Sequence, residues 1–283
     1  MSLSDLDDDN PNQATPPRSL IVTVYGLYAR EGGGWISVST LIQLLSVLDV
    51  DDQAVRSSIS RLKRREILVS ERRHGRAGYA LSPYARSVLH TGDRRIFERH
   101  AARDDGWVIA VFSVPESERR HRYQLRSRLT WLGFGTVSSG VWIAPGHALA
   151  DTRDHLQRHG LDQYVNLFYG DYVAFGDPAE LVGHWWDLEA LQKLYDDFVA
   201  EFTPMAGRWA DHERNTLSDR DAFVDYVHVL TAWRRFPYLD PGLPSALLPT
   251  TWSGTKAADL FFELRSALER PAHRFARDLL ADS

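Results

Sequence analysis

Basic side chains crowd into one short segment of a chain whose formal net charge is −5. Between residues 56 and 76, eight lysines and arginines stand against two glutamates, so this segment carries +6 by subtraction. The eight are Arg56, Arg61, Lys63, Arg64, Arg65, Arg72, Arg73 and Arg76. Such cations neutralise phosphates, and arginine can also donate two hydrogen bonds to guanine O6 and N7. The segment is therefore the candidate surface for a nucleic acid, and the contact must be focused because the acidic chain as a whole repels one.

A predicted helix that begins after Asp51 positions the first half of these side chains. Val55, Ile59 and Leu62 recur at i, i+4 and i+7, which predicts one buried stripe. The outward side chains predicted to contact nucleic acid are Gln53, Arg56, Ser57, Ser60, Arg61, Lys63 and Arg64. Arg56, Ser57, Ser60 and Arg61 are placed to read bases, and Lys63 and Arg64 farther along to contact phosphates.

A predicted hairpin carries the second half. Residues 67–73 and 79–81 are predicted strands, with 74–78 as a tip whose two glycines are free to take positive φ. The side chains predicted to lie along the backbone or in the minor groove are Arg72, Arg73, His74 and Arg76. Two helices precede, one along residues 20–28 and one along 41–48 with Ser37 or Ser39 as N-cap. Three helices followed by a two-stranded wing are typical of a winged helix-turn-helix.

The remaining sequence predicts two further domains in an α+β fold. Residues 1–18, rich in Asp and Pro, are expected to form a disordered tail, 19–82 the winged-helix DNA-binding domain and 83–103 a connecting helix. Residues 104–176 alternate as βαββαβ, the order of a ferredoxin-like domain. Residues 177–283 are predicted to be all-helical, with one helix along 181–198 and the last over roughly 256–268.

Several chemistries are disfavoured by what the sequence lacks. With no cysteine, the chain has no disulfide, thiolate nucleophile or cysteine-type zinc site. His155 and His159 have metal-pair spacing, but the zincin glutamate is missing and Arg158 would repel a cation. Because no catalytic constellation appears, we expect no enzyme, no metal and no cofactor. No run of 18 apolar residues and no signal peptide is found, so we expect a cytoplasmic protein without membrane contact.

Three groups of motifs, in this order, are specific when taken together. The first is 54–62 (AVRSSISRL) with 75–81 (GRAGYAL), and the second is 107–112 (WVIAVF) with 133–135 (GFG) and 140–143 (GVWI). The third is 233–237 (WRRFP), 240–241 (DP), 243–244 (LP) and 247–249 (LLP), followed by Trp252, Gly254 and Ala257. From about residue 17 to beyond 268, the chain resembles the phenylacetic-acid-degradation repressors of the PaaX type.

The resemblance implies a homodimeric repressor that leaves its double-stranded DNA operator when an aryl-CoA thioester binds. The implied effector is phenylacetyl-CoA or another aryl-CoA thioester, and the implied target is a phenylacetate-type catabolic operon. For this effector, the composition of the C-terminal region suggests aromatic contacts and two cations for the CoA phosphates. These residues are Trp186, Trp233, Arg234 and Arg235.

Two alternatives use the same basic surfaces: an RNA-binding protein, or a metal-dependent nuclease built on the central domain. That domain resembles the small CRISPR-associated endoribonucleases, but the metal-binding acid at the end of their first strand is replaced here by Ser113-Val114-Pro115. Segment 51–76 has no Phe, Tyr or Trp to stack on RNA bases. A second basic helix, 119–132, is interpreted as solvated surface or as a contact between subunits ahead of a DNA contact.

Overall fold

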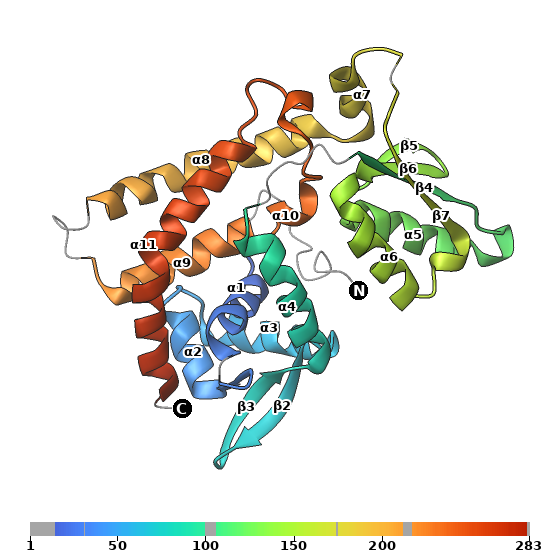
Figure 1. Cartoon of the computed structure of the whole chain (residues 1–283). Coiled ribbons are helices and arrows are strands. Elements are labelled where there is room, and N and C mark those ends of the chain that lie inside the picture. The colour runs from blue at the N-terminus through green and yellow to red at the C-terminus, as the bar shows by residue number, and fades with distance from the viewer. Residues whose placement is uncertain (1–14, 31, 100–105, 174, 212–216, 282–283) are drawn as a thin grey trace.

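The computed structural model describes residues 15–30, 32–99, 106–173, 175–211 and 217–281. Over these residues the protein is α+β, with helices around two antiparallel sheets (Figure 1). The predicted tail falls almost entirely on residues 1–14, outside the described residues. None of the described helices has the length and apolar character needed to cross a membrane.

The N-terminal region folds into helices packed on a three-stranded sheet. Its elements are α1 (Pro17–Val24), a π-helical turn η2 (Tyr25–Ala29), β1 (Trp35–Ser37), α2 (Val38–Ser46), α3 (Asp52–Arg64), β2 (Leu68–Arg73) and β3 (Arg76–Leu81), with sheet order β1-β3-β2. The Ser37 hydroxyl accepts the Thr40 N–H and starts α2, and the Asp51 carboxylate accepts the Ala54 N–H and starts α3. The N-cap predicted for α3 is confirmed. Of the two N-caps predicted as alternatives for α2, Ser37 is the one observed and Ser39 is not.

The turn between β2 and β3 is tighter than the sequence predicted. His74 and Gly75 alone form it, with φ of 49° and 79°, and Arg76 already pairs with Arg73. The predicted five-residue tip is wrong, because Gly78 is needed for close packing and not for a turn. A Cβ on Gly78 would lie 2.5 Å from the Trp35 ring and from the Ile36 carbonyl oxygen. Glycine at 78 lets β1 join the hairpin.

The connecting helix α4 (Pro83–Phe97) begins at Ser82, whose hydroxyl accepts the Ala85 N–H. It ends at Phe97 because Glu98 is extended, so the predicted continuation is wrong at residues 98 and 99, and residues 100–105 lie outside the described residues. The central region then follows as β4 (Trp107–Phe112), η3 (Glu116–Glu118), α5 (Arg119–Trp131), β5 (Gly135–Ser138), β6 (Val141–Pro145), η4 (Gly146–Ala148), α6 (Leu149–Arg158), η5 (Asp162–Tyr164) and β7 (Val165–Gly170). Its four strands are antiparallel in the order β5-β6-β4-β7, and α5 and α6 pack on one face through Leu125, Leu129 and Leu156.

The C-terminal region is helical over its described residues, but two helix boundaries differ from the prediction. It contains α7 (Pro178–Trp185), α8 (Leu188–Ala210), α9 (Asp219–Trp233), α10 (Phe236–Leu239), η6 (Ser245–Leu247) and α11 (Gly254–Ala281). The single helix predicted along 181–198 is two, because Trp186 is extended and the Asp187 carboxylate caps α8 at Ala190. The last helix continues through Pro271, since Ala272 and Ala276 prolong its buried stripe.

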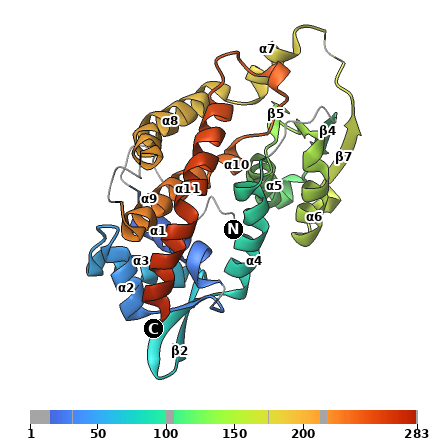
Figure 2. The same cartoon turned by 60° about the vertical axis from the view of Figure 1, so that its left-hand side comes forward.

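The N-terminal and C-terminal regions share one hydrophobic core. Residues of α1 to α3 and of α8, α9 and α11 belong to the same buried cluster, and Figure 2 shows α11 running alongside α9 toward α1 and α2. Within it the Thr231 hydroxyl donates to Thr23 Oγ1 over 2.8 Å, and the Tyr28 and Phe223 rings lie 5.4 Å apart. The central region has its own core. Any movement of the basic surface therefore carries the C-terminal helices with it.

Candidate nucleic-acid interface

The outward face of α3 presents the predicted set to solvent. All seven polar side chains from Gln53 to Arg64 in that set are exposed, whereas Val55, Ser58, Ile59 and Leu62 are buried. Within this set Arg56 makes a loose ion pair with Asp52 at 3.9 Å, with both side chains 63% exposed. A pair that exposed contributes little to stability and leaves Arg56 available to a ligand.

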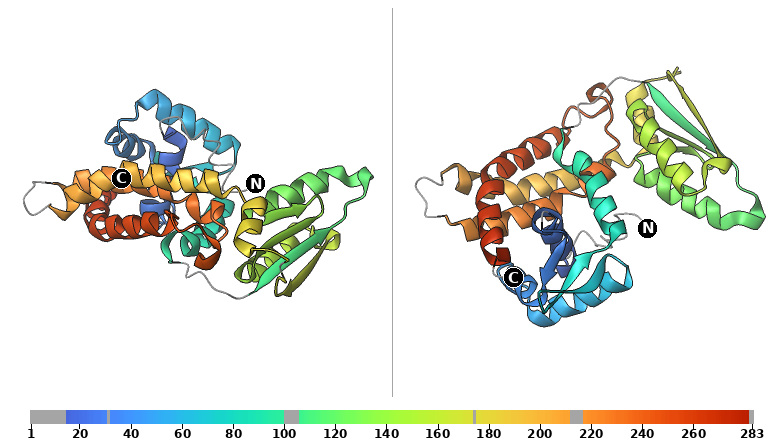
Figure 3. Two further views of the ribbon diagram at one scale, coloured as in Figure 1. Left: turned by 90° about the horizontal axis from the view of Figure 1, so that it is seen from above. Right: turned by 60° about the horizontal axis from the view of Figure 1, so that its bottom comes forward.

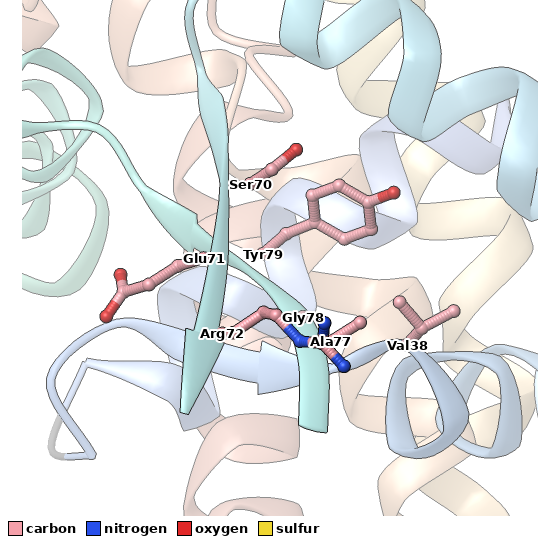
Figure 4. A pocket seen from close by; sticks show the side chains of 7 residues that line it. All are labelled: Val38, Ser70, Glu71, Arg72, Ala77, Gly78 and Tyr79. Atoms are coloured by element: carbon pink, nitrogen blue, oxygen red, sulfur yellow. The ribbon is translucent and has the colours of Figure 1, made fainter. Parts of the chain in front are cut away.

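Strand alternation places Arg72 on the same side of the hairpin as α3. Ser70 and Arg72 on β2 pair with Tyr79 and Ala77 on β3, so these four side chains lie on one face of the hairpin. The Lys63 ammonium of α3 lies 5.7 Å above the Tyr79 ring. Figure 4 shows Ser70, Arg72, Ala77 and Tyr79 around a hollow of about 210 Å³ beside Val38 at the start of α2. Cations of α3 and of the hairpin thus border one continuous surface.

The hairpin tip adds two exposed basic groups. His74 is the first residue of the two-residue turn, Arg76 directly follows the turn, and both are exposed. The Arg72 guanidinium donates to the Gly75 carbonyl over 3.3 Å, which ties its side chain to the turn. The tip therefore projects its cations beyond α3, as Figure 1 shows for the end of the β2–β3 hairpin.

Arg73 is placed differently from the other predicted contacts. It lies on the opposite face of β2, half-buried, where its Nε donates to Glu71 Oε1 over 2.7 Å. Its terminal nitrogens donate to the carbonyls of Gly32 and Gly33, and the guanidinium lies 5.7 Å from the Trp35 ring centroid. Arg73 thus fastens the hairpin to the turn before β1, a role that the charge pattern alone did not reveal.

A buried tyrosine holds the hairpin to the first helix. Tyr25, fully buried in the π-helical turn, donates its hydroxyl to the Tyr79 carbonyl over 3.0 Å. Burial raises the pKa of this hydroxyl far above its ordinary value, with a smaller contribution from Tyr79, so the donor stays protonated. The surface formed by α3 and the hairpin rests on this fixed base.

The four residues predicted for an effector are not brought together. Trp233 is buried in the shared core, stacked 4.7 Å from Phe261, and donates its indole N–H to the Ile96 carbonyl. Trp186 lies against the central region, where its indole N–H donates to Gly133 and its ring contacts Gly135. Arg234 is buried beside Trp233, and Arg235 lies 5.5 Å from the Phe236 ring. The two tryptophans therefore belong to different packing regions.

A junction of three regions escaped the sequence analysis. Arg95 on α4 lies 5.1 Å from the Trp131 ring centroid on α5 and 5.5 Å from that of Tyr238 on α10. It also donates to the Asp151 carboxylate on α6 over 2.8 Å. Trp131 and Tyr238 stack at 5.7 Å. One cation thereby links the helix that follows the hairpin to both other regions, and no local pattern signals it.

The junction continues into the histidine pair noted in the sequence. The His155 ring lies 4.9 Å from Trp131 and 4.3 Å from His159. Burial, reinforced by His159 and Arg128, lowers the pKa of His155 to about 3, so its neutral Nε2 accepts a hydrogen bond from Arg128 at 2.8 Å. In the described part of the chain no group of three or more His, Asp or Glu is arranged to hold a metal.

Comparisons with known proteins place this architecture in one family. Three sequence models match in succession: the PaaX-like protein at residues 16–85, the PaaX protein central Cas2-like domain at 100–182 and the PaaX-like protein C-terminal domain at 186–278. Together they define a three-part regulator-type chain with a Cas2-like centre. The chain belongs to the PaaX family.

Two relatives match over most of the chain. The Escherichia coli K12 protein named "Transcriptional repressor PaaX" is 25% identical over 263 residues, which are 92% of this chain and 83% of that relative. The structure of the uncharacterized protein Rv0674 from Mycobacterium tuberculosis superposes with a TM-score of 0.60 at 21% identity, covering 93% of this chain and all of that one. The second likeness shows that the fold is shared.

Proposed function

We propose that this protein is a DNA-binding transcriptional repressor whose N-terminal region acts as a winged helix-turn-helix. The observation that carries the proposal is the outward face of α3, where Arg56, Ser57, Ser60 and Arg61 are exposed beside a basic hairpin. A helix of this kind fits the major groove, and the hairpin fits the adjacent backbone or minor groove. The name of the Escherichia coli relative supports the same function.

The effector that we propose is phenylacetyl-CoA or another aryl-CoA thioester, and the target is an operon for phenylacetate-type catabolism. Family membership supports this assignment, and it also supports the homodimer that we propose as the binding unit. A two-fold dimer would bind inverted half-sites about one helical turn, or a multiple of it, apart. For the central region we propose a ferredoxin-like βαββαβ fold without enzymatic activity.

Release from DNA requires two arrangements of the protein, one of which the effector binds more tightly. The Arg95 junction is the contact that we propose to differ between them. Because α4 directly follows β3, a shift of the central or C-terminal region at Trp131 or Tyr238 moves the base of the hairpin. Trp233 and Arg234, two of the residues predicted to contact the effector, directly precede α10, so we propose that an effector bound there would act on Tyr238.

The function is tested by isolating the genomic duplex DNA fragments that the protein retains and measuring its binding to them. We expect protection of one inverted site, loss of binding with added phenylacetyl-CoA, and a change in tryptophan fluorescence on titration with the thioester. Equal affinity for single-stranded RNA at matched salt, or strand cleavage in divalent metal, would favour the RNA-binding or nuclease alternative instead. A thioester that changes neither fluorescence nor DNA affinity contradicts the effector assignment.

A further inference from the structure

Helix α5 carries five arginines, and neighbouring groups engage two of them. Arg122 lies 3.2 Å from Glu116 and donates to the Val114 carbonyl, and Arg128 contacts His155. Glu118 is engaged by His121 and Tyr164. Arg119, Arg120 and Arg126 are exposed and form no ion pair within the part of the chain that the structure describes.

Two of these arginines share a face with an exposed aromatic residue, and Arg120 lies beside that face in the first turn. Arg119, Tyr123 and Arg126 follow each other at i, i+4 and i+7, while Leu125 and Leu129 turn to the core of the central region. The Tyr123 side chain is 72% exposed. Arginine guanidinium and tyrosine hydroxyl groups both donate to phosphate oxygens. Seven residues of helix span about 10 Å, roughly three base-pair steps of one DNA strand.

A purely solvated helix face accounts poorly for this composition. Exposed helices usually mix acidic and basic residues, whereas the first turn of α5 contains no acid and begins with Arg119 and Arg120. Cations at a helix N-terminus oppose the helix dipole and destabilise the helix. The acids just before the helix, Glu116 and Glu118, are taken up by other partners.

The placement of α5 also suits a long polyanion. Figures 1 and 3 show the α5 and α6 layer on the side of the central sheet that is turned toward the same end of the molecule as α3 and the hairpin. A duplex that meets α3 and continues past the central region would therefore meet α5.

We propose that Arg119, Arg120, Tyr123 and Arg126 form a second DNA contact, which binds the phosphate backbone of the duplex flanking the segment that α3 reads. The inference rests on the proposed DNA-binding function and extends it. This contact carries no base preference, because phosphates are the same in every sequence. It adds affinity and salt dependence to operators with sufficient flanking DNA, and it assigns to residues 119–132 a DNA contact in place of a solvated or intersubunit face.

The test compares two duplexes and three proteins. One duplex holds only the segment protected around α3 and the hairpin, and the other extends it by about 15 base pairs on each side, about 50 Å of axis. The proteins are wild type, the triple variant Arg119→Ala, Arg120→Ala and Arg126→Ala, and a control with Lys193→Ala, Arg220→Ala and Arg270→Ala. The control removes the same charge from exposed positions on the C-terminal helices.

We expect the α5 variant to bind the short duplex as wild type does and the long duplex about tenfold or more weakly. Its salt slope on the long duplex should fall by about 0.9 for each lost phosphate contact, and the control should match wild type on both. Equal affinity of the α5 variant and wild type for the long duplex overturns the proposal, and so does a changed oligomeric state. Failure of wild type to bind either duplex would refute the repressor function itself, a separate result.

Discussion

The guanidinium of Arg95 lies 5.1 Å from the ring centroid of Trp131, and this contact joins the helix behind the hairpin to the central region. The Arg95 side chain is only 18% exposed, and its ion pair with Asp151 adds a second attachment. Cation–π contacts that are partly desolvated contribute about 1 to 2 kcal/mol. An interaction of this size is strong enough to bias two arrangements and weak enough for a ligand to overcome it.

Replacing Arg95 by alanine should uncouple the effector from DNA. We expect Arg95→Ala to bind operator DNA but to lose most of the change in affinity that phenylacetyl-CoA produces, because α4 no longer follows the central region. The measurement is operator affinity with and without the thioester. Arg94→Ala is the matched control, since the neighbouring Arg94 side chain is 84% exposed and makes only a 4.0 Å contact with Glu98. An undiminished effector response in Arg95→Ala would remove the junction from the mechanism.

Base reading and phosphate binding should separate within the basic surface. Arg56→Ala should cost about 1 to 3 kcal/mol of operator binding and relax base preference, because a bidentate contact to guanine is lost. Arg76→Ala should weaken specific and random DNA alike and reduce the salt slope by about 1. Competition with random duplex across a salt series distinguishes the two. Equal losses on both DNAs for Arg56→Ala contradict its assignment.

Arg73 and Arg72 should differ although they are adjacent and identical in type. Arg73→Ala removes three hydrogen bonds and the contact with Trp35, so it should lower the free energy of unfolding by about 1 to 2 kcal/mol. Arg72→Ala should leave stability nearly unchanged and weaken DNA binding. Denaturant unfolding and a salt titration of DNA affinity measure the two effects. The reverse pattern would restore Arg73 to the DNA contacts.

The sequence alone predicted the position and the exposed face of α3, because the residues that determine them are close together in the chain. Asp51 caps the helix, and Val55, Ile59 and Leu62 fix which side is buried, so the exposed set follows from a period of 3.6. The turn at His74 and Gly75 was mispredicted because Gly78 also suggested a turn. Glycine is required at position 78 because the Trp35 ring approaches its backbone closely. Trp35 belongs to β1, more than 40 residues earlier in the chain.

Contacts between distant segments account for the other differences. The continuous apolar stripe from Leu181 to Phe198 gave no sign of a break, and only the capping of α8 by Asp187 and the packing of Trp186 on Gly133 reveal it. The shared core likewise joins Tyr28 to Phe223, which no periodicity connects. The tryptophans and arginines of the C-terminal region suggested an effector site, but composition alone does not show which aromatic rings are buried in a hydrophobic core.

The histidine at the junction should make stability fall in mild acid. His155 has a folded-state pKa of about 3, below its ordinary value near 6.5, because it is half-buried among cations. Between these values the unfolded chain binds the proton and the folded chain does not, so stability is full above about pH 6.5 and declines as pH falls toward 3. His155→Gln lacks this dependence. The gap in unfolding free energy between wild type and His155→Gln should therefore shrink from pH 7.5 to pH 5, in denaturant titrations with exposed His90→Gln as the control. A gap that stays constant with pH would mean that His155 takes up its proton equally in both states.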